Sequence, residues 1–351
     1  MITGIEYGAV TEKDESLPDN LVCTADGSIS ARDSATGELY HNRAGAYLEA
    51  LNNYIRPSRW QWLIEEKPGE KRRISLFDGC FGLGYNSFVL WDEIVNRRAL
   101  LDTVEVEAVE IDPGVLAVLP AVLSQDCFHF MSSGIIVDNL SCAELADDQS
   151  VRGRTLLEAF QWLADKQAGV DLGRAKIEIR ARFERSTSFT LQLYFADLRA
   201  HLQALHLSKI AAFDFVFHDP FSPSKVPELW TIDIFQRYHK LLSARATSRL
   251  LTYSAASAVR GGLQGAGFSI YRTMAVGAKT GGTLAVPVAW SDDQEEHELA
   301  DGVVLPLADE ERKKLAGRSG VPYKDPNLCA DRRHILKCRE AEQHAMRAKL
   351  D

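Results

Sequence analysis

Cysteine is scarce in this sequence, and no cysteine pair marks a metal site. The chain has only six cysteines in 351 residues, and none forms a CxxC pair: Cys23, Cys80, Cys127, Cys142, Cys329 and Cys338. This content argues against a disulfide scaffold and against a structural zinc site. We therefore expect a protein of a reducing cytoplasm with no bound metal.

Long hydrophobic runs are also absent. No apolar stretch reaches the ~18 residues that cross a bilayer, and the acidic start lacks the basic and apolar regions of a secretory signal. Apolar residues make up 46% and charged residues 25% of the chain, as in soluble globular proteins. Disordered, collagen-like and coiled-coil architectures are excluded, and at roughly 100–200 residues per domain the length allows one large or two modest domains.

The sequence lacks an overall excess of positive charge. Its net charge is -9, which argues against binding by non-specific phosphate contacts alone. The distribution is uneven, because residues 292–311 hold nine acids and no Lys or Arg, whereas residues 312–351 hold eleven Lys and Arg against five acids. We expect an acidic loop and then a basic helical tail, which is either a solvated surface helix or a local surface for a polyanion.

The order of elements predicts an α/β fold. Turn-forming residues 24–42 favour a short hairpin, and residues 43–55 favour a helix capped by Asn42. From residue 72 a strand, a glycine-rich turn, a helix, a strand with terminal acids and another helix follow one another, as in a doubly wound sheet. Residues 124–175 interrupt this pattern as an insertion that holds one helix, over 155–167.

The second half predicts the rest of the sheet. Residues 176–184 and 189–197 alternate apolar and polar side chains, so we expect two strands that can pair with each other. Residues 213–217 form an apolar run typical of a strand buried on both faces, and residues 228–242 form an amphipathic helix. A strand, a helix and two strands complete residues 248–290. We therefore expect three parts: 1–60, a hairpin and helix; 61–290, the α/β domain; and 291–351, the tail.

A glycine loop lies between the first long strand and its helix. It comprises Asp78, Gly79, Cys80, Phe81, Gly82, Leu83, Gly84, Tyr85 and Asn86. Glycines allow a tight turn and a close approach of backbone to ligand. Glu110 ends the next strand, where the two oxygens of a carboxylate match two adjacent ribose hydroxyls. Together these features favour a cofactor that contains a nucleoside over a plain turn.

Asp197 ends a further strand in the same way. Its carboxylate could accept a hydrogen bond from the exocyclic amine of adenine. It could equally cap the helix that begins at Leu198, which is a common role of aspartate. The sequence leaves these two roles open.

The run His218-Asp219-Pro220-Phe221 follows the buried strand and is the second strong motif. An acid, a proline and an aromatic residue at this place are typical of enzymes that methylate exocyclic amines. A carboxylate can orient a neutral amine and take its proton, and an aromatic face can pack on a base or a cation. The alternatives are a capping acid beside a structural histidine, or a metal site, for which further ligands are missing.

Four segments resemble one known family, the methyltransferase domain of the bacterial tRNA wobble-uridine modification enzyme MnmC. They are FVFHDPFSPSKVPELWTIDIF, LLTYSAASAVRGGLQGAGF, LQLYFADLRAHL and GSISARDSATGELYHNRAGAYLEA. They occur in the family's order between residues 26 and 285. The resemblance implies a class I, Rossmann-like methyltransferase fold, whose parallel sheet ends in an antiparallel strand pair. The last two strands expected before residue 290 would form that pair.

The resemblance also implies an activity. It is the transfer of a methyl group from S-adenosylmethionine to the aminomethyl arm of 5-aminomethyl-(2-thio)uridine in tRNA. Asp219 would be catalytic, and the anticodon stem-loop of tRNA would be the partner. The residues expected at the cofactor are Asp78, Gly79, Phe81, Gly82, Gly84, Asn86, Glu110 and Asp197. Those expected at the substrate are Phe221, Lys225 and Lys279.

The chain departs from the family at three places. Cys80 stands where a glycine is usual, and Lys279 alone remains of a basic pair near the end of the domain. The flavin oxidase domain of bifunctional members is not expected after residue 290. Two rival hypotheses are an amine methyltransferase with another substrate and a catalytically silent tRNA-binding module. The acids Asp78, Glu110, Asp197 and Asp219 argue against silence, because RNA binding has no need of buried carboxylates.

Overall fold

The computed structural model describes most of the chain. It covers residues 20–33, 36–65, 72–99, 101–129, 134–145, 151–183, 187–205, 209–274 and 281–347. Lys279 lies outside these residues, so its expected contact with substrate stays a prediction. In the part of the chain described, no helix has the length and apolar character needed to cross a membrane.

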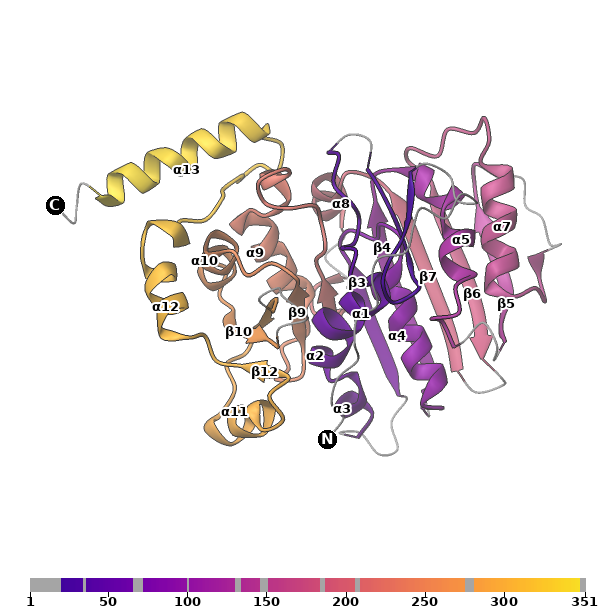
Figure 1. The fold of residues 1–351 in the computed structure, drawn as a ribbon, viewed down its shortest axis with the longest axis horizontal. Coiled ribbons are helices and arrows are strands. Elements are labelled where there is room, and N and C mark those ends of the chain that lie inside the picture. The colour runs from indigo at the N-terminus through magenta and orange to yellow at the C-terminus, as the bar shows by residue number, and fades with distance from the viewer. Residues whose placement is uncertain are drawn as a thin grey trace.

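A ten-stranded sheet runs through the described residues in the order β12-β10-β11-β9-β8-β3-β4-β7-β6-β5 (Figure 1). The five central strands, from β9 to β7, are parallel, and antiparallel strands extend the sheet on both sides. This is the Rossmann-like fold expected from the sequence, with β10 and β11 as its antiparallel pair. The strands are β3 (Arg73–Asp78), β4 (Thr103–Glu110), β5 (Ile135–Cys142), β6 (Lys176–Phe183), β7 (Thr187–Phe195), β8 (Phe215–Phe217), β9 (Arg249–Thr252), β10 (Ser269–Thr273), β11 (Thr283–Val286) and β12 (Val304–Leu305).

Helices cover both faces of this sheet (Figure 1). Before the sheet come the hairpin β1 (Leu21–Cys23) and β2 (Ile29–Ala31), α1 (Ala46–Ala50), the π-helical turn η1 (Leu51–Ile55), α2 (Arg56–Ser58) and α3 (Trp60–Glu65). Between the strands lie α4 (Tyr85–Asn96), η2 (Pro113–Ala117), α5 (Leu119–Leu123), α7 (Leu156–Lys166), α8 (Leu198–Ala204), η5 (Pro227–Leu229), α9 (Ile232–Leu241) and α10 (Ser257–Gly265). The C-terminal part holds α11 (Asp292–Leu299), α12 (Asp309–Ala316), η6 (Arg318–Gly320) and α13 (Arg332–Arg347).

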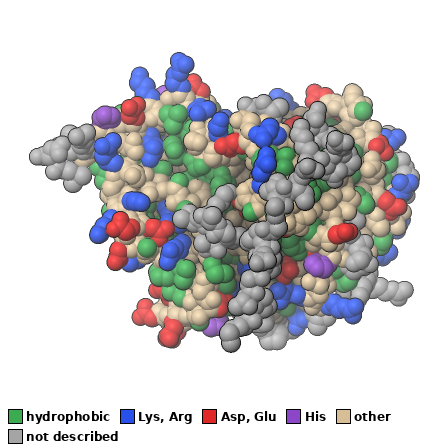
Figure 2. Space-filling model, in the orientation of Figure 1, with side chains coloured by type: hydrophobic (Ala, Val, Ile, Leu, Met, Phe, Trp, Pro, Cys, Tyr) green, Lys and Arg blue, Asp and Glu red, His purple; other side chains and the backbone are tan. Residues whose placement is uncertain are grey.

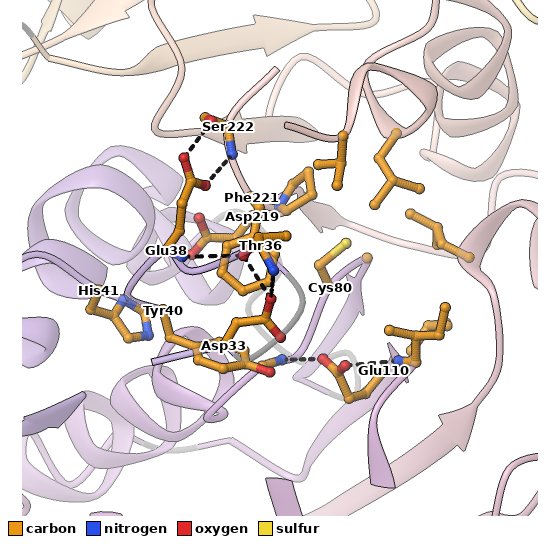
Figure 3. Close-up of a pocket in the computed structure, with 18 of the residues that line it drawn as sticks. Asp33, Thr36, Glu38, Tyr40, His41, Cys80, Glu110, Asp219, Phe221 and Ser222 are labelled. Atoms are coloured by element: carbon orange, nitrogen blue, oxygen red, sulfur yellow. Dashed lines mark hydrogen bonds between the residues drawn. The ribbon is translucent and has the colours of Figure 1, made fainter. Parts of the chain in front are cut away.

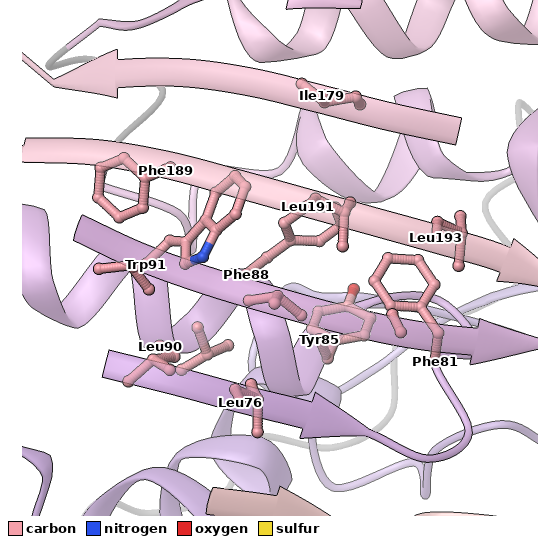
Figure 4. Close-up of a cluster of buried hydrophobic side chains, with 14 of the residues drawn as sticks. Leu76, Phe81, Tyr85, Phe88, Leu90, Trp91, Ile179, Phe189, Leu191 and Leu193 are labelled. Carbon is pink, nitrogen blue, oxygen red and sulfur yellow. The ribbon is translucent and has the colours of Figure 1, made fainter. Parts of the chain in front are cut away.

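The central strands bury side chains on both faces. In β3, Ile74 and Leu76 join the core formed with α4, α5 and α7, whereas Phe77 joins the core formed with α8, α9 and α10. Figure 4 shows the first core, in which Phe88 and Trp91 of α4 lie against Phe189 and Leu191 of β7. Burial on both faces explains the nearly unbroken apolar runs of these strands.

Two expectations about local structure are wrong. The first N-terminal helix begins at Ala46, with Gly45 and not Asn42 at its N-cap, because the Asn42 side chain accepts a hydrogen bond from the Ala44 N–H instead. Residues 292–311 do not form a loop, since α11, β12 and the start of α12 occupy them, and β12 pairs with β10. Acids at the N-terminal ends of α11 and α12 favour helix there.

Residues 124–175, which we expected as an insertion, contribute strand β5 to the edge of the sheet. Their helix, α7, begins with the Thr155–Glu158 capping box, and their strand, β5, pairs antiparallel with β6. The expected pairing of the two following strands is also present, as β6 and β7.

At the C-terminal end of the chain, the basic residues Arg332, Arg333 and Lys337 are exposed on α13. Figure 2 shows Lys and Arg side chains on that part of the surface.

Candidate active site

Four acids meet where the central parallel strands end. Asp78 ends β3 and Glu110 ends β4, while Asp197 and Asp219 lie two residues beyond the ends of β7 and β8. Parallel strands place their carboxyl ends at one edge of a sheet, where α/β proteins bind ligands. Glu110, Asp197 and Asp219 line one cavity of about 650 Å³ at this edge, a volume in the range of small-molecule sites.

The glycine loop lies beside this cavity. The Gly79 N–H donates to the Phe217 carbonyl oxygen at 2.8 Å, and a Cβ at Gly79 would lie 2.4 Å from the Tyr238 hydroxyl oxygen. Gly84 is the N-cap of α4 and has a φ of 75°, in the left-handed region that favours glycine. Gly79, Cys80 and Gly82 line the cavity, whereas Phe81 is buried and packs on Phe88, so Phe81 supports the loop from within the core.

Cys80 presents its side chain at this loop (Figure 3). Burial raises the pKa of the Cys80 thiol well above its usual value, and the neighbouring Glu110 and Asp78 add to the shift. The residue that replaces the family's glycine therefore stays an uncharged thiol at neutral pH.

Glu110 holds the loop as well as facing the cavity. One carboxylate oxygen accepts the Gly82 N–H at 2.8 Å, and the other accepts the N–H groups of Ile111 and Asp112 at 2.8 and 2.9 Å. Of the roughly four lone-pair positions of a carboxylate, these bonds occupy three. Burial raises the pKa of Glu110, while the three backbone hydrogen bonds act against that shift.

Asp78 lies beneath the loop rather than in the cavity wall. It is fully buried, and one oxygen accepts a 2.6 Å hydrogen bond from the Ser87 hydroxyl. Its other oxygen has no partner among the described residues. Burial raises the pKa of Asp78 to about 7, with a further increase from the nearby Asp219 and Glu110.

Asp219 is joined directly to the helix that follows the loop. The Asn86 side-chain amide donates to one Asp219 carboxylate oxygen at 2.7 Å, and Asn86 is only 2% exposed. Burial raises the pKa of Asp219, while the charge of His41 and the hydrogen bonds of Asn86 and Tyr54 act in the opposite direction. Asn86, predicted at the cofactor, therefore contacts the predicted catalytic acid.

The structure gives Asp197 the capping role that the sequence left open. Its side chain caps α8 by accepting the Arg199 N–H at 2.7 Å. Its other oxygen forms an ion pair with the Arg199 guanidinium at 3.2 Å. Asp197 still lines the cavity, but Arg199 engages both of its oxygens.

His218 is a structural residue. It is fully buried, one ring nitrogen lies 3.0 Å from the Tyr238 hydroxyl oxygen, and the other lies 2.9 Å from the Leu229 carbonyl oxygen. Burial lowers the pKa of His218 to about 3, so the ring is neutral and both nitrogens are engaged. In the described part of the chain, no group of three or more His, Cys, Asp or Glu side chains could hold a metal ion.

The N-terminal segment forms one wall of the cavity, which the motifs of the sequence do not predict. Both carboxylate oxygens of Glu38 bind Ser222, at 2.7 Å to the hydroxyl and 3.1 Å to the N–H, and the Tyr40 ring lies 5.1 Å from the Phe221 ring (Figure 3). The sequence signal for this wall is the segment at residues 27–50, which resembles the start of the family's domain.

The predicted substrate residues differ in position. Phe221 lines the cavity against Tyr40. Lys225 is exposed outside the cavity, and its ammonium nitrogen lies 3.4 Å from the Thr36 carbonyl oxygen.

The cavity is strongly acidic. Seven carboxylates line it against two arginines: Asp33, Glu38, Glu49, Glu110, Asp197, Asp219 and Glu228 against Arg32 and Arg199. Such a lining attracts a cation and disfavours the pyrophosphate of a dinucleotide.

A solved structure and a family model are similar to this chain. The crystal structure of MnmC2 from Aquifex aeolicus superposes on 95% of this chain and 87% of that chain, with a TM-score of 0.61 and 24% identity. Residues 166–287 match the model of a family described as S-adenosyl-L-methionine-dependent methyltransferase. The chain has a methyltransferase fold.

Curated relatives confirm the resemblance to MnmC. The tRNA 5-methylaminomethyl-2-thiouridine biosynthesis bifunctional proteins MnmC of Burkholderia multivorans and Burkholderia vietnamiensis are 25% and 28% identical over 73% and 74% of this chain. The chain spans about a third of the length of these proteins, 33% and 34%. The uncharacterized protein MJ0670 of Methanocaldococcus jannaschii is 23% identical over 94% of this chain and 74% of its own length.

Proposed function

We propose that this protein transfers a methyl group from S-adenosylmethionine to the aminomethyl arm of 5-aminomethyl-(2-thio)uridine at the wobble position of tRNA. The observation that carries the proposal is the position of Asp219. This half-buried acid lines an acidic cavity at the carboxyl edge of the sheet and is followed by Pro220 and Phe221. The name of the MnmC relatives supports the choice of substrate.

The cavity suits this cofactor. S-adenosylmethionine contains no phosphate, and its sulfonium centre is favoured by the seven surrounding carboxylates. Gly79 and Gly82 would bring the backbone close to it, and Glu110 would use its remaining lone pair for a ribose hydroxyl. When bound, the cofactor supplies a methyl group on a positively charged sulfur.

Asp219 would prepare the amine. An amine attacks only through a free lone pair, so it must be neutral and correctly oriented. Asn86 and Tyr54 hydrogen-bond the Asp219 carboxylate. Of its roughly four lone-pair positions, one would accept an N–H of the amine and then its proton. Phe221, beside Tyr40, would give the uridine ring an aromatic surface.

Two measurements test the function. Purified protein should bind S-adenosylhomocysteine in calorimetry, and NAD should not compete. It should methylate tRNA purified from a deletion strain, and mass spectrometry of the nucleosides should show a mass increase of one methyl group on the aminomethyl uridine. Methylation of free amines without any effect on this tRNA would favour the rival amine methyltransferase, and the absence of both cofactor binding and transfer would favour a silent RNA-binding module.

A further inference from the structure

Helix α13 carries a run of basic side chains that the proposed reaction does not use. Between residues 332 and 339 it holds Arg332, Arg333, Lys337 and Arg339 and no acid. Arg332, Arg333 and Lys337 are exposed, and we call these three side chains the basic face of α13. The family model ends at residue 287, so the basic face lies outside the part of the chain that this model matches.

The fold does not need the basic face for its own contacts. The side chains of Arg333 and Lys337 have no hydrogen-bond or ion-pair partner among the described residues, whereas Arg339 donates to the carbonyl oxygens of Val321 and Ser319. Arg332 and Arg333 also lie in the first turn of α13, where the helix macrodipole favours acids over cations. A charge pattern that opposes a local preference without a compensating contact is expected at a functional site.

The basic face begins at the rim of the cavity. Arg332 donates a 2.7 Å hydrogen bond to the Ser224 carbonyl oxygen. The Ser224 hydroxyl oxygen lies 3.0 Å from that of Ser222, which lines the cavity. Ser224 and Lys225 are exposed, so this segment forms part of the rim. From here α13 extends to the C-terminal end of the molecule (Figure 1).

The charges of the cavity and of the basic face are opposite. Seven carboxylates line the cavity, so it repels the phosphates of a nucleic acid, which must stay outside while one base enters. Lys and Arg side chains are common partners of such phosphates. A lipid surface fits less well, because Ile335 of the same helix is fully buried in the core formed with α8, α9 and α10 and cannot insert into a membrane.

We propose that the basic face of α13, together with Lys225 at the rim, binds phosphates of the tRNA that flank the nucleotide whose base enters the cavity. The inference rests on the proposed function, because it takes tRNA as the substrate. These contacts would position the tRNA without reading its sequence. A chain of net charge -9 needs such a local surface, since its overall field repels a polyanion.

The test measures the Kd of tRNA purified from the deletion strain at several salt concentrations. In the double variant Arg333→Gln/Lys337→Gln we expect the Kd at low salt to rise roughly tenfold. The slope of log Kd against log salt should fall by about one to two, since each lost phosphate contact removes about 0.7–0.9. Thermal melting checks that the variant is folded.

The matched control is Arg152→Gln/Arg154→Gln. It removes the same charge from two exposed positions just before α7, at the opposite end of the molecule from α13 (Figure 1). This variant should keep the wild-type Kd and slope, because a change in net charge alone does not remove a phosphate contact. If Arg333→Gln/Lys337→Gln does not fold, the single variant Lys337→Gln should still lower the slope by about one.

The other outcomes separate this inference from the proposed function. A wild-type Kd and slope in Arg333→Gln/Lys337→Gln, or an equal change in the control, makes α13 a solvated helix, and the proposed function stands if the tRNA is methylated. Weaker binding of the double variant to phosphatidylserine vesicles, with tRNA binding unchanged, assigns the basic face to a membrane and overturns the inference. If the wild type binds tRNA through these side chains but does not methylate it, the basic face stands and the proposed function fails.

Discussion

Asp219 connects the two parts of the site. It follows β8 in the chain, yet its carboxylate is bound by Asn86 from the helix after the glycine loop. The residue expected to act on the amine is thus anchored to the element expected to hold the cofactor. A displacement of either element would change the orientation of the acid.

We expect Asp219→Ala to lose methyl transfer while cofactor affinity changes little. General-base catalysis contributes ~10²–10⁴-fold to a rate, and poor alignment of the amine adds to the loss. Single-turnover assays on tRNA with the aminomethyl arm, at saturating cofactor, measure the effect. A folded variant that keeps more than about a tenth of the wild-type rate, well above that range, would show that Asp219 only ends a turn.

Replacement of Asn86 should change the pH dependence of the reaction. The Asn86 amide lowers the pKa of Asp219 against the effect of burial. In Asn86→Ala the pKa of Asp219 should rise further, and the acid limb of the kcat–pH profile should move to higher pH. Ser87→Ala is the matched control, because Ser87 binds Asp78 and not Asp219; an equal shift in both variants would contradict a specific role of Asn86.

Glu110→Ala should reduce both cofactor affinity and stability. Sequence analysis alone predicts a loss at the ribose, but Glu110 also binds three backbone N–H groups, including that of Gly82. The loss of a hydrogen bond to a charged group is worth about 1.5–3 kcal/mol, or roughly 10- to 150-fold in affinity. Calorimetry and thermal melting measure the two effects.

Glu105→Ala provides the control for Glu110, because Glu105 lies on the same strand in an exposed pair with Arg73. Exposed ion pairs contribute about 0–1 kcal/mol to stability, so the cofactor affinity and the melting temperature of this variant should change little. If Glu110→Ala binds the cofactor as tightly as the wild type, Glu110 only holds the glycine loop and does not bind the ribose.

At the scale of elements, a buried ion pair anchors α11 to the sheet. Arg249 of β9 is fully buried between the rings of Trp62 and Trp290, and both of its terminal nitrogens bind the Glu298 carboxylate. The acidic composition of residues 292–311 predicted a loop. One acid of this helix, Glu298, neutralises the buried guanidinium and so fixes α11 against the sheet.

Glu298→Ala should therefore strongly destabilise the protein. Removal of one partner from a buried ion pair costs about 3–5 kcal/mol, since the other charge stays buried. Glu296→Ala, at an exposed position of the same helix, should lie within about 0.5 kcal/mol of the wild type. Urea denaturation compares the two variants, and equal midpoints would show that the Arg249–Glu298 pair is not a determinant of stability.

At the scale of the whole molecule, the carboxyl cluster couples folding to pH. Burial raises the pKa values of Asp78, Glu110 and Asp219, so the folded protein binds more protons at these groups than the unfolded chain. Their contribution to stability is therefore lost as pH rises from the ordinary carboxyl pKa of 3.8 toward the value of about 7 at Asp78.

Asp78→Asn should remove part of this dependence. One proton changes the free energy of unfolding by at most about 1.4 kcal/mol per pH unit. Relative to the wild type, the variant should gain stability as pH increases from 4 to 7, because it has no carboxylate to ionise at this buried site. Denaturation of both proteins at several pH values measures the difference, and a difference that does not vary with pH would contradict a raised pKa.

Local chemistry and periodicity in the sequence were enough to predict the alternation of strands and helices, the glycine loop and the acids at the strand ends. Those features depend on neighbouring residues, such as the apolar run before His218 and the glycines that follow Asp78. Only the tertiary structure decided what each acid binds. Asn86 and Asp219 are 133 positions apart, and Glu38 and Ser222 are 184 apart. No local pattern encodes such pairs, because they arise only when the sheet brings its strand ends together and the N-terminal segment closes over them.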